Sequence, residues 1–156
     1  TQHHDLAFGD FRQTGKAQLA FWNQGAKTLF IATPPENPRR ANWSYEPIFV
    51  ASNETKNWYA EGCTAADVDG DGFTDLIAGN YWFKFQDGKF KPIKFGVDGG
   101  RVIAAKFRAG KKMQIAVSPG DGKGHLMLYE CTGSAEVSEN WKGRDLIGRE
   151  LIHGHT

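Results

Sequence analysis

Short apolar runs separated by polar turns make up most of the chain. Asp-Gly pairs at 87–88, 98–99 and 121–122 interrupt the pattern at places where hairpins turn. No segment has the 3.6-residue periodicity and the capping residues of a long helix. The pattern predicts an all-β domain of short strands, with apolar strand cores at Leu19–Trp22, Leu76–Ala78, Ile115–Val117 and Leu126–Tyr129.

The pattern also repeats along the chain. Residues 6–19, 63–76 and 102–115 align without gaps, at offsets of 57 and 39 residues. Each copy has a small apolar strand, a polar turn and a second apolar strand. Unequal offsets around a constant core predict a repeat architecture with loop insertions between units. The predicted repeats are 1–56, 57–98 and 99–152, all in a single domain, with 153–156 opening a further one. The proline-rich segment 33–40 is predicted to join two outer strands of the first repeat.

The turn of the middle repeat carries the strongest chemical signal. Residues 67–75 read DVDGDGFTD, in which four carboxylates can converge on one hard cation, and calcium is the ion implied. The glycines at 70 and 72 allow the sharp turn. The predicted ligands are side-chain oxygens of four aspartates and one backbone carbonyl: Asp67, Asp69, Asp71, Asp75 and the carbonyl of Phe73.

Two other interpretations of this turn are weaker. A plain acidic hairpin turn needs one Asp-Gly pair and has no reason to carry four repelling charges. An EF-hand needs a glutamate at the twelfth place, which is Ala78 here, and it needs flanking helices, whereas a β-rich run follows.

The equivalent turns of the first and third repeats lack this ligand set. The ligand places hold Asp10, Arg12, Thr14 and Gln18 in the first repeat, and Lys106, Arg108, Gly110 and Gln114 in the third. A fixed positive charge replaces a metal ion there. We therefore expect one Ca²⁺ per chain.

The whole pattern resembles the FG-GAP or VCBS repeats of integrin-type β-propellers and of many secreted microbial proteins. The motif is most specific at residues 65–79, AADVDGDGFTDLIAG. The resemblance implies four-stranded blades, with this chain supplying about three blades of a larger, seven-bladed propeller. The partners it implies are further blades from the same or another chain, or a second copy of this chain. It also implies an exported protein, in the extracellular space or the periplasm. The first residues lack the features of a signal peptide, so either a leader is removed or the chain is part of a longer protein.

Composition narrows the choice of partners. A net charge of +1 argues against a nucleic-acid footprint, and the absence of an apolar run of about 18 residues argues against a membrane span. Cys63 aligns with apolar strand positions and is expected to be a small buried side chain. A disulfide with Cys131 is the less favoured alternative.

Two groups of residues are candidates for further chemistry if the chain forms a propeller. His4, Glu61 and His155 share one register at the start of inner strands, where they would face the central channel as acid, base or metal ligand. Alternatively, each makes a hydrogen bond to a neighbouring blade, or the histidines near the ends are flexible. Trp58 and Tyr59 are candidates for a sugar-binding platform, although recurring aromatic residues more often pack between blades.

Two functional hypotheses follow. The first is a calcium-stabilised binding or scaffold module of propeller type from an exported protein, with carbohydrate as a candidate ligand. The alternative is a segment of a propeller-type carbohydrate-active enzyme, a polysaccharide lyase or a sugar dehydratase, with a channel-facing His/Glu site. The sequence contains none of the common hydrolase, phosphate-binding or zinc-protease motifs.

Overall fold

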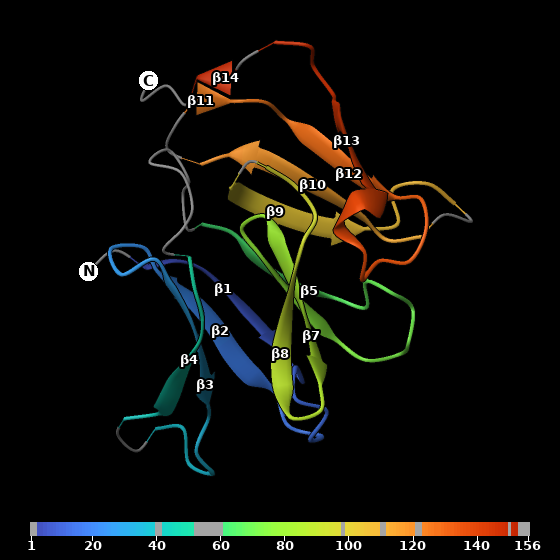
Figure 1. The fold of residues 1–156 in the computed structure, drawn as a ribbon. Coiled ribbons are helices and arrows are strands. Elements are labelled where there is room, and N and C mark those ends of the chain that lie inside the picture. The colour runs from blue at the N-terminus through green and yellow to red at the C-terminus, as the bar shows by residue number, and fades with distance from the viewer. Residues whose placement is uncertain are drawn as a thin grey trace.

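Three antiparallel sheets of four strands each follow one another along the chain in the computed structural model (Figure 1). The structure describes residues 3–39, 42–51, 61–97, 99–109, 112–120, 123–149 and 151–152. The prediction of four-stranded blades is confirmed. The described residues form an all-β structure apart from one short 3₁₀ turn, η1 (Ser138–Asn140).

Each of the first two sheets is a simple meander, in which every strand pairs with the next one in sequence. The first contains β1 (His3–Gly9), β2 (Gln18–Asn23), β3 (Thr28–Thr33) and β4 (Ser44–Val50). The second contains β5 (Cys63–Ala66), β6 (Asp75–Ala78), β7 (Tyr81–Gln86) and β8 (Lys89–Lys94). The proline-rich segment joins β3 to β4, as its sequence predicts.

The third sheet keeps this order but has a short excursion between its second and third strands. It contains β9 (Gly100–Ala105), β10 (Gln114–Pro119), β12 (Met127–Cys131) and β13 (Trp141–Asp145). The excursion includes β11 (Lys123–Gly124), which pairs with β14 (Leu151–Ile152) at the top of the view in Figure 1.

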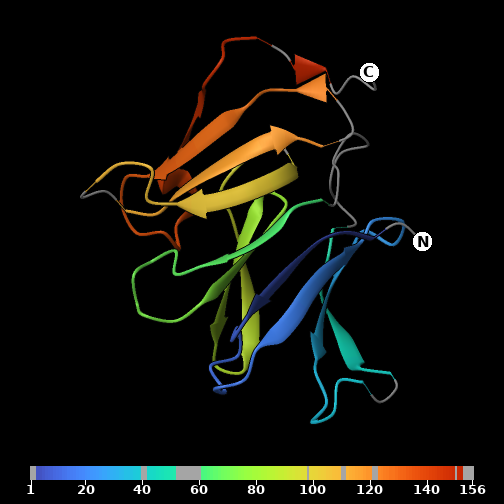
Figure 2. The ribbon, with the colours of Figure 1, turned by 180° about the vertical axis from the view of Figure 1, so that it is seen from behind.

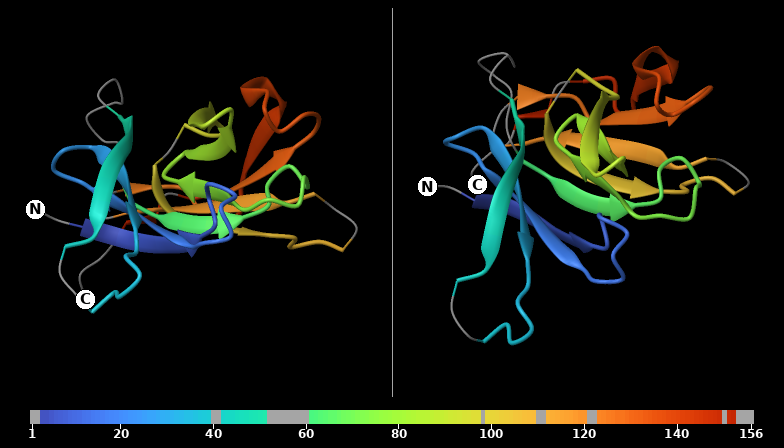
Figure 3. Two further views of the ribbon diagram at one scale, coloured as in Figure 1. Left: turned by 90° about the horizontal axis from the view of Figure 1, so that it is seen from below. Right: turned by 60° about the horizontal axis from the view of Figure 1, so that its bottom comes forward.

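The first strands of the three sheets lie next to one another. β5 contacts β1 on one side and β9 on the other, so the second sheet lies between the first and the third. The views from behind and from below show the same succession of sheets (Figures 2 and 3). This is the arrangement of neighbouring blades around the axis of a propeller.

Strand register confirms the ungapped alignment of the three repeat cores. Gly9 pairs with Gln18, Ala66 with Asp75, and Ala105 with Gln114. These pairs are related by the offsets of 57 and 39 residues that the sequence alignment gives. The boundaries predicted between repeats are not tested by this register and stay predictions.

The hydrophobic core forms two clusters, one on each side of the second sheet. Trp22, Leu29 and Ile31 of the first sheet pack with Phe83 of the second. On the other face of the second sheet, Trp82, Ile77 and Ile93 pack with Ile115 and Trp141 of the third. Each fully buried large side chain contributes about 1.5–3 kcal/mol to folding. The alternation of Trp82 and Phe83 along β7 lets one strand supply both clusters.

Cys63 belongs to the first cluster and is buried, as predicted, and Cys131 is half-buried in the third sheet. Both thiols are free, so the alternative of a disulfide is wrong.

Two outer strands contain a proline, Pro47 in β4 and Pro92 in β8. Proline has no N–H to donate, so it is tolerated at the edge of a sheet and disfavoured inside one. At Pro47 in β4 and at Pro92 in β8, one backbone N–H is therefore missing. The missing donor would point either toward the neighbouring strand or outward from the sheet edge.

Candidate metal centre

The loop between β5 and β6 is folded around the side chain of Asp67. Its Oδ1 accepts hydrogen bonds from the backbone N–H groups of Gly70 and Asp71 at 2.8 and 3.1 Å, and its Oδ2 accepts one from Gly72 at 3.0 Å. Gly70 and Gly72 have φ angles of +82° and +88°, which side chains with a Cβ rarely adopt. The sequence places these glycines where the backbone must turn to reach Asp67.

The loop brings three of the predicted ligands together. Asp67, Asp69 and Asp71 each offer a carboxylate oxygen, and these oxygens lie within 4.8 Å of one another. Calcium binds oxygen at about 2.3–2.6 Å, so ligands on opposite sides of one ion are roughly 5 Å apart. The three carboxylates therefore fit one calcium ion, which would supply positive charge to hold them. Among the residues that the structure describes, this is the one group of three or more acidic, histidine or cysteine side chains close enough together to hold a metal ion.

Asp75 lies at the base of the loop, as the first residue of β6. Its Oδ2 accepts a hydrogen bond from the N–H of Val68 at 2.9 Å, and the residue is only 4% exposed. Burial, with repulsion from Asp69 and Asp71, raises the pKa of Asp75 to about 7 despite that hydrogen bond. A cation in the loop would relieve this repulsion. Phe73, whose carbonyl is the fifth predicted ligand, is half-exposed, and its N–H donates to Asp71 Oδ1 at 2.9 Å.

Sequence reasoning missed one charged side chain at this loop. The ammonium of Lys84, on β7, forms a close ion pair with Asp69 Oδ2 and lies 2.9 Å from Asp71 Oδ2. Burial works to lower the pKa of Lys84, but its bonds to Asp69 and Asp71 outweigh this and raise it. For Asp71, likewise, the hydrogen bonds from Lys84 and Phe73 overcome burial and hold the pKa below its ordinary value. Hairpin register is the available signal, because continuing the pairing of Leu76 with Phe83 by one residue brings Lys84 opposite Asp75.

Comparison with known proteins decides the family of this segment. The pattern that defines the FG-GAP repeat matches residues 60–103, which contain the loop, all of β5 to β8 and most of β9. Residues 60–103 are an FG-GAP repeat. No curated protein and no solved structure matches the chain.

The turn of the first sheet copies the FG-GAP loop without its acidic cluster. Asp10 accepts hydrogen bonds from the N–H groups of Thr14 and Gly15 at 2.8 and 2.6 Å, as Asp67 does from Asp71 and Gly72. At the place of Asp69, this turn has Arg12, which forms an ion pair with Glu46 on β4.

The turn of the third sheet is basic. Arg108 takes the place of Asp69, and its guanidinium lies 3.9 Å from Glu130 on β12. Gln114 takes the place of Asp75 and is equally buried, with its amide donating to Glu130. An uncharged amide therefore occupies this buried position in both sheets that flank the second sheet, since Gln18 is its counterpart in the first.

Glu61, a candidate for the central channel, lies just before β5 and is fully buried. Its Oε1 accepts a hydrogen bond from Gln24 of the first sheet at 3.1 Å, and its Oε2 is 4.0 Å from Arg101 Nε of the third. Gly120 packs so closely that a Cβ there would lie 2.3 Å from Oε2. This geometry matches the alternative in which Glu61 bonds to neighbouring blades.

The described contacts of Glu61 include neither His4 nor His155, the other two channel candidates. The backbone of His4 is part of β1 and pairs with Trp22, and its side chain lies outside the description. His155, Trp58 and Tyr59 lie outside the described residues.

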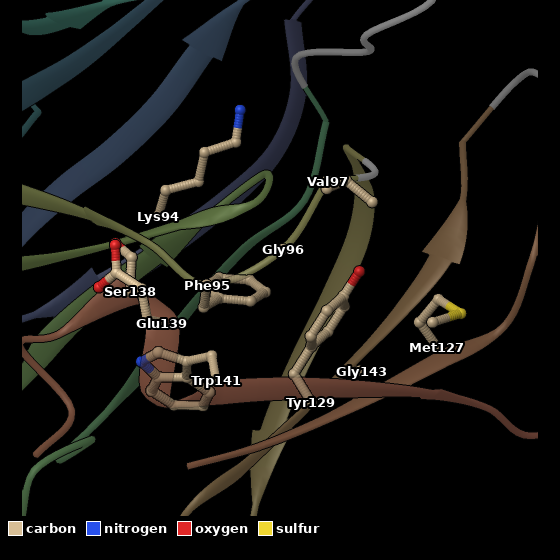
Figure 4. A pocket seen from close by; sticks show the side chains of 10 residues that line it. All are labelled: Lys94, Phe95, Gly96, Val97, Met127, Tyr129, Ser138, Glu139, Trp141 and Gly143. Atoms are coloured by element: carbon tan, nitrogen blue, oxygen red, sulfur yellow. The ribbon is translucent and has the colours of Figure 1, made fainter. Parts of the chain in front are cut away.

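A separate hollow of about 450 Å³ lies between the end of β8 and the third sheet (Figure 4). Its aromatic walls are Phe95, Tyr129 and Trp141, whose rings contact one another with centroids 5.4 and 5.7 Å apart. All three residues are at most 6% exposed. Their main role is therefore to pack the seam between the second and third sheets, and they present little ring surface to a ligand.

Proposed function

We propose that this chain is a calcium-stabilised propeller module in which the FG-GAP loop binds one Ca²⁺ ion. The observation that carries the proposal is the convergence of Asp67, Asp69 and Asp71 within 4.8 Å in a matched FG-GAP repeat. Four aspartates lie within nine residues, and the single ammonium of Lys84 offsets only part of their mutual repulsion. Three of the aspartates lie at the exposed end of a hairpin, where an ion has access. Calcium prefers such all-oxygen sites.

Calcium titration with a stability measurement tests this function. At a free calcium concentration a hundred times the dissociation constant, linkage predicts about 2.7 kcal/mol of added stability. Thermal unfolding should shift upward with calcium relative to chelator, and metal analysis should return about one calcium per chain. The Asp67→Asn and Asp71→Asn variants should lose the shift. Equal midpoints for the natural protein in calcium and in chelator would refute calcium binding.

We further propose that the first sheet continues against another blade. Its face turned away from the second sheet carries Leu6, Phe8 and Tyr45 at 56–64% exposure. Phe21 and Phe30 stack between them with centroids 5.5 Å apart, and Tyr45 meets both rings edge-on. An apolar sheet face of this kind is buried in stable domains. A seven-bladed propeller, completed by the same chain, another chain or a second copy, is the architecture we expect.

An exported location is part of the same proposal. Extracellular calcium modules work with dissociation constants of roughly 10⁻⁴–10⁻³ M, which demand a calcium-rich compartment. No helix among the described residues is long and apolar enough to cross a membrane. Carbohydrate binding stays a prediction from the sequence, because its candidate platform, Trp58 and Tyr59, lies outside the described residues.

A further inference from the structure

A cation supplied by the chain already lies on the carboxylates of the metal centre. The Lys84 ammonium pairs with Asp69 Oδ2 and lies 2.9 Å from Asp71 Oδ2, with only 15% of the side chain exposed. Both oxygens belong to aspartates of the group that would ligate calcium. An ammonium in hydrogen-bond contact with these oxygens and a calcium ion coordinated by them would repel each other at short range.

The third sheet supports a fixed role for this lysine. Strand register makes Glu130 the counterpart of Lys84, because Gln114 pairs with Glu130 where Asp75 would pair with Lys84. Glu130 faces Arg108, and Arg108 is the counterpart of Asp69. The same two positions therefore carry an ion pair in both sheets, with the charges exchanged. In the second and third sheets alike, a residue on the third strand, Lys84 or Glu130, carries the charge opposite to that of the loop.

A displaced Lys84 ammonium has another carboxylate within reach. Glu136 Oε1, in the segment between β12 and η1, lies 3.7 Å from Lys84 Nζ. The preceding residue, Ala135, accepts hydrogen bonds through its carbonyl from the indole N–H groups of Trp82 and Trp141 at 3.2 and 2.9 Å. Glu136 is therefore held at the seam between the second and third sheets.

We propose that Lys84 is a built-in counter-cation of the metal centre, which calcium must displace toward Glu136. This inference rests on the proposed calcium function and deepens it. Lys84 lowers calcium affinity, because binding the ion costs the two contacts that Lys84 makes with Asp69 and Asp71. It also couples calcium binding to the contact between the second and third sheets.

Isothermal titration with CaCl₂ on the full chain tests the competition. The Lys84→Met variant removes the ammonium and keeps the length of the side chain, and we expect its calcium dissociation constant to fall on the order of tenfold. Lys91→Met is the matched control. Lys91 pairs with Lys84 across β7 and β8, and its ammonium forms an ion pair with Glu136 Oε2 at 3.6 Å. Removing it changes the net charge equally and should alter the dissociation constant by less than about twofold.

The outcomes separate the inference from the proposed function. Equal or weaker binding by Lys84→Met, with the natural protein binding calcium, overturns the inference and leaves the function standing. No binding by either protein overturns both. Binding by Lys84→Met alone overturns the proposed calcium function of the natural loop and supports Lys84 as the counter-cation of that loop. A Lys84→Met protein that folds only with calcium supports the inference too, because ion and ammonium then fill the same role.

A double-mutant cycle tests the destination of the ammonium. Glu136→Gln should weaken calcium binding more in the natural background than in the Lys84→Met background, because only the former has an ammonium to receive. An equal effect in both backgrounds would show that Glu136 acts only as a distant charge and would overturn the proposed coupling.

Discussion

At the scale of residues, Asp10 and Asp67 show that hydrogen bonds to the first aspartate can shape these loops without a metal ion. Both carboxylates accept the same pair of backbone N–H groups, four and five residues further along the chain. The first loop keeps this shape although Arg12, Thr14 and Gln18 stand at three of the four aspartate positions. Calcium would then stabilise a loop that is already organised by its first aspartate, which lowers the entropy cost of binding.

Asp10→Ala should lower the midpoint of thermal unfolding at pH 7. The pKa of Asp10 is held below its ordinary 3.8 mainly by the hydrogen bond from the backbone N–H of Thr14. Burial raises this pKa by a smaller amount. Because the pKa is lowered by folding, this stabilisation is present above the unfolded-chain value and is lost as the pH falls through the folded-state pKa. Midpoints of the two proteins should therefore converge as the pH falls below the folded-state pKa of Asp10. Asp10→Asn, which keeps one acceptor oxygen, should fall between them. A constant difference at all pH values would contradict the charge-based account.

The two thiols should differ sharply in reactivity. Burial, with a smaller contribution from Asp5, raises the pKa of the Cys63 thiol far above its usual range, so little thiolate is available. Cys131 is half-buried in the third sheet. Iodoacetamide followed by mass spectrometry should label Cys131 in the folded protein and Cys63 only after denaturation. Labelling of Cys63 first would show that the inner face of β5 opens.

Residue-level prediction succeeded where chemistry is local in sequence and failed where it depends on packing. The convergence of Asp67, Asp69 and Asp71 follows from their spacing in one turn. The contact with Lys84 requires the register across β6 and β7, and that with Glu136 requires the docking of another sheet. The burial of Glu61 depends on Gly120, which is 59 residues away in the chain (61 to 120).

At the scale of elements, the close approach of β5 and β9 depends on one glycine. Gly62 immediately precedes β5 with a φ of +73°, and a Cβ there would lie 2.3 Å from the carbonyl oxygen of Gly100. No rotation of a side chain relieves that clash, because the opposing atoms belong to backbone. The inner strands of two sheets can meet here only because this position has no side chain.

Gly62→Ala should destabilise the fold by clearly more than Gly88→Ala. Gly88 has nearly the same φ, +75°, but has open space around its missing Cβ. Gly88→Ala thus measures the backbone cost alone, about 1 kcal/mol, and the excess for Gly62→Ala measures the close approach. Chemical denaturation of both variants provides the comparison. Equal losses would mean that β5 and β9 can separate slightly without cost.

Element-level prediction succeeded because the repeat offsets carry register information. Once residues 6–19, 63–76 and 102–115 are aligned, the pairing of the first two strands in one sheet gives the pairing in the others. The insertion of β11 and its pairing with β14 has no counterpart in the parts of the other repeats that the structure describes, so alignment offers no guide to it.

At the scale of the whole molecule, the first sheet presents aromatic surface that its own neighbours do not cover. A repeat array with an uncovered terminal face is expected to associate or to dissolve poorly. The sequence predicts this incompleteness from the number of repeats. The structure identifies the face involved, with Phe8 and Tyr45 prominent on it.

The isolated chain should therefore self-associate in solution through this face. Light scattering coupled to size exclusion should give a mass above 17.3 kDa that rises with concentration. The double variant Leu6→Lys/Phe8→Glu, which leaves net charge unchanged, should shift the distribution toward monomer. Val97→Lys, at a 78% exposed site outside this face, should not. A monodisperse natural monomer would instead indicate a self-contained three-sheet domain.

The prolines of the outer strands restrict how such assemblies can grow. A strand added alongside β4 or β8 would meet Pro47 or Pro92, where the ladder of backbone hydrogen bonds is interrupted or bent. Addition of sheets face to face involves no such obstacle. Exposed apolar surface on the first sheet is thus directed toward stacking of complete blades, and lateral extension into fibrillar cross-β aggregates is disfavoured at the two edges formed by β4 and β8.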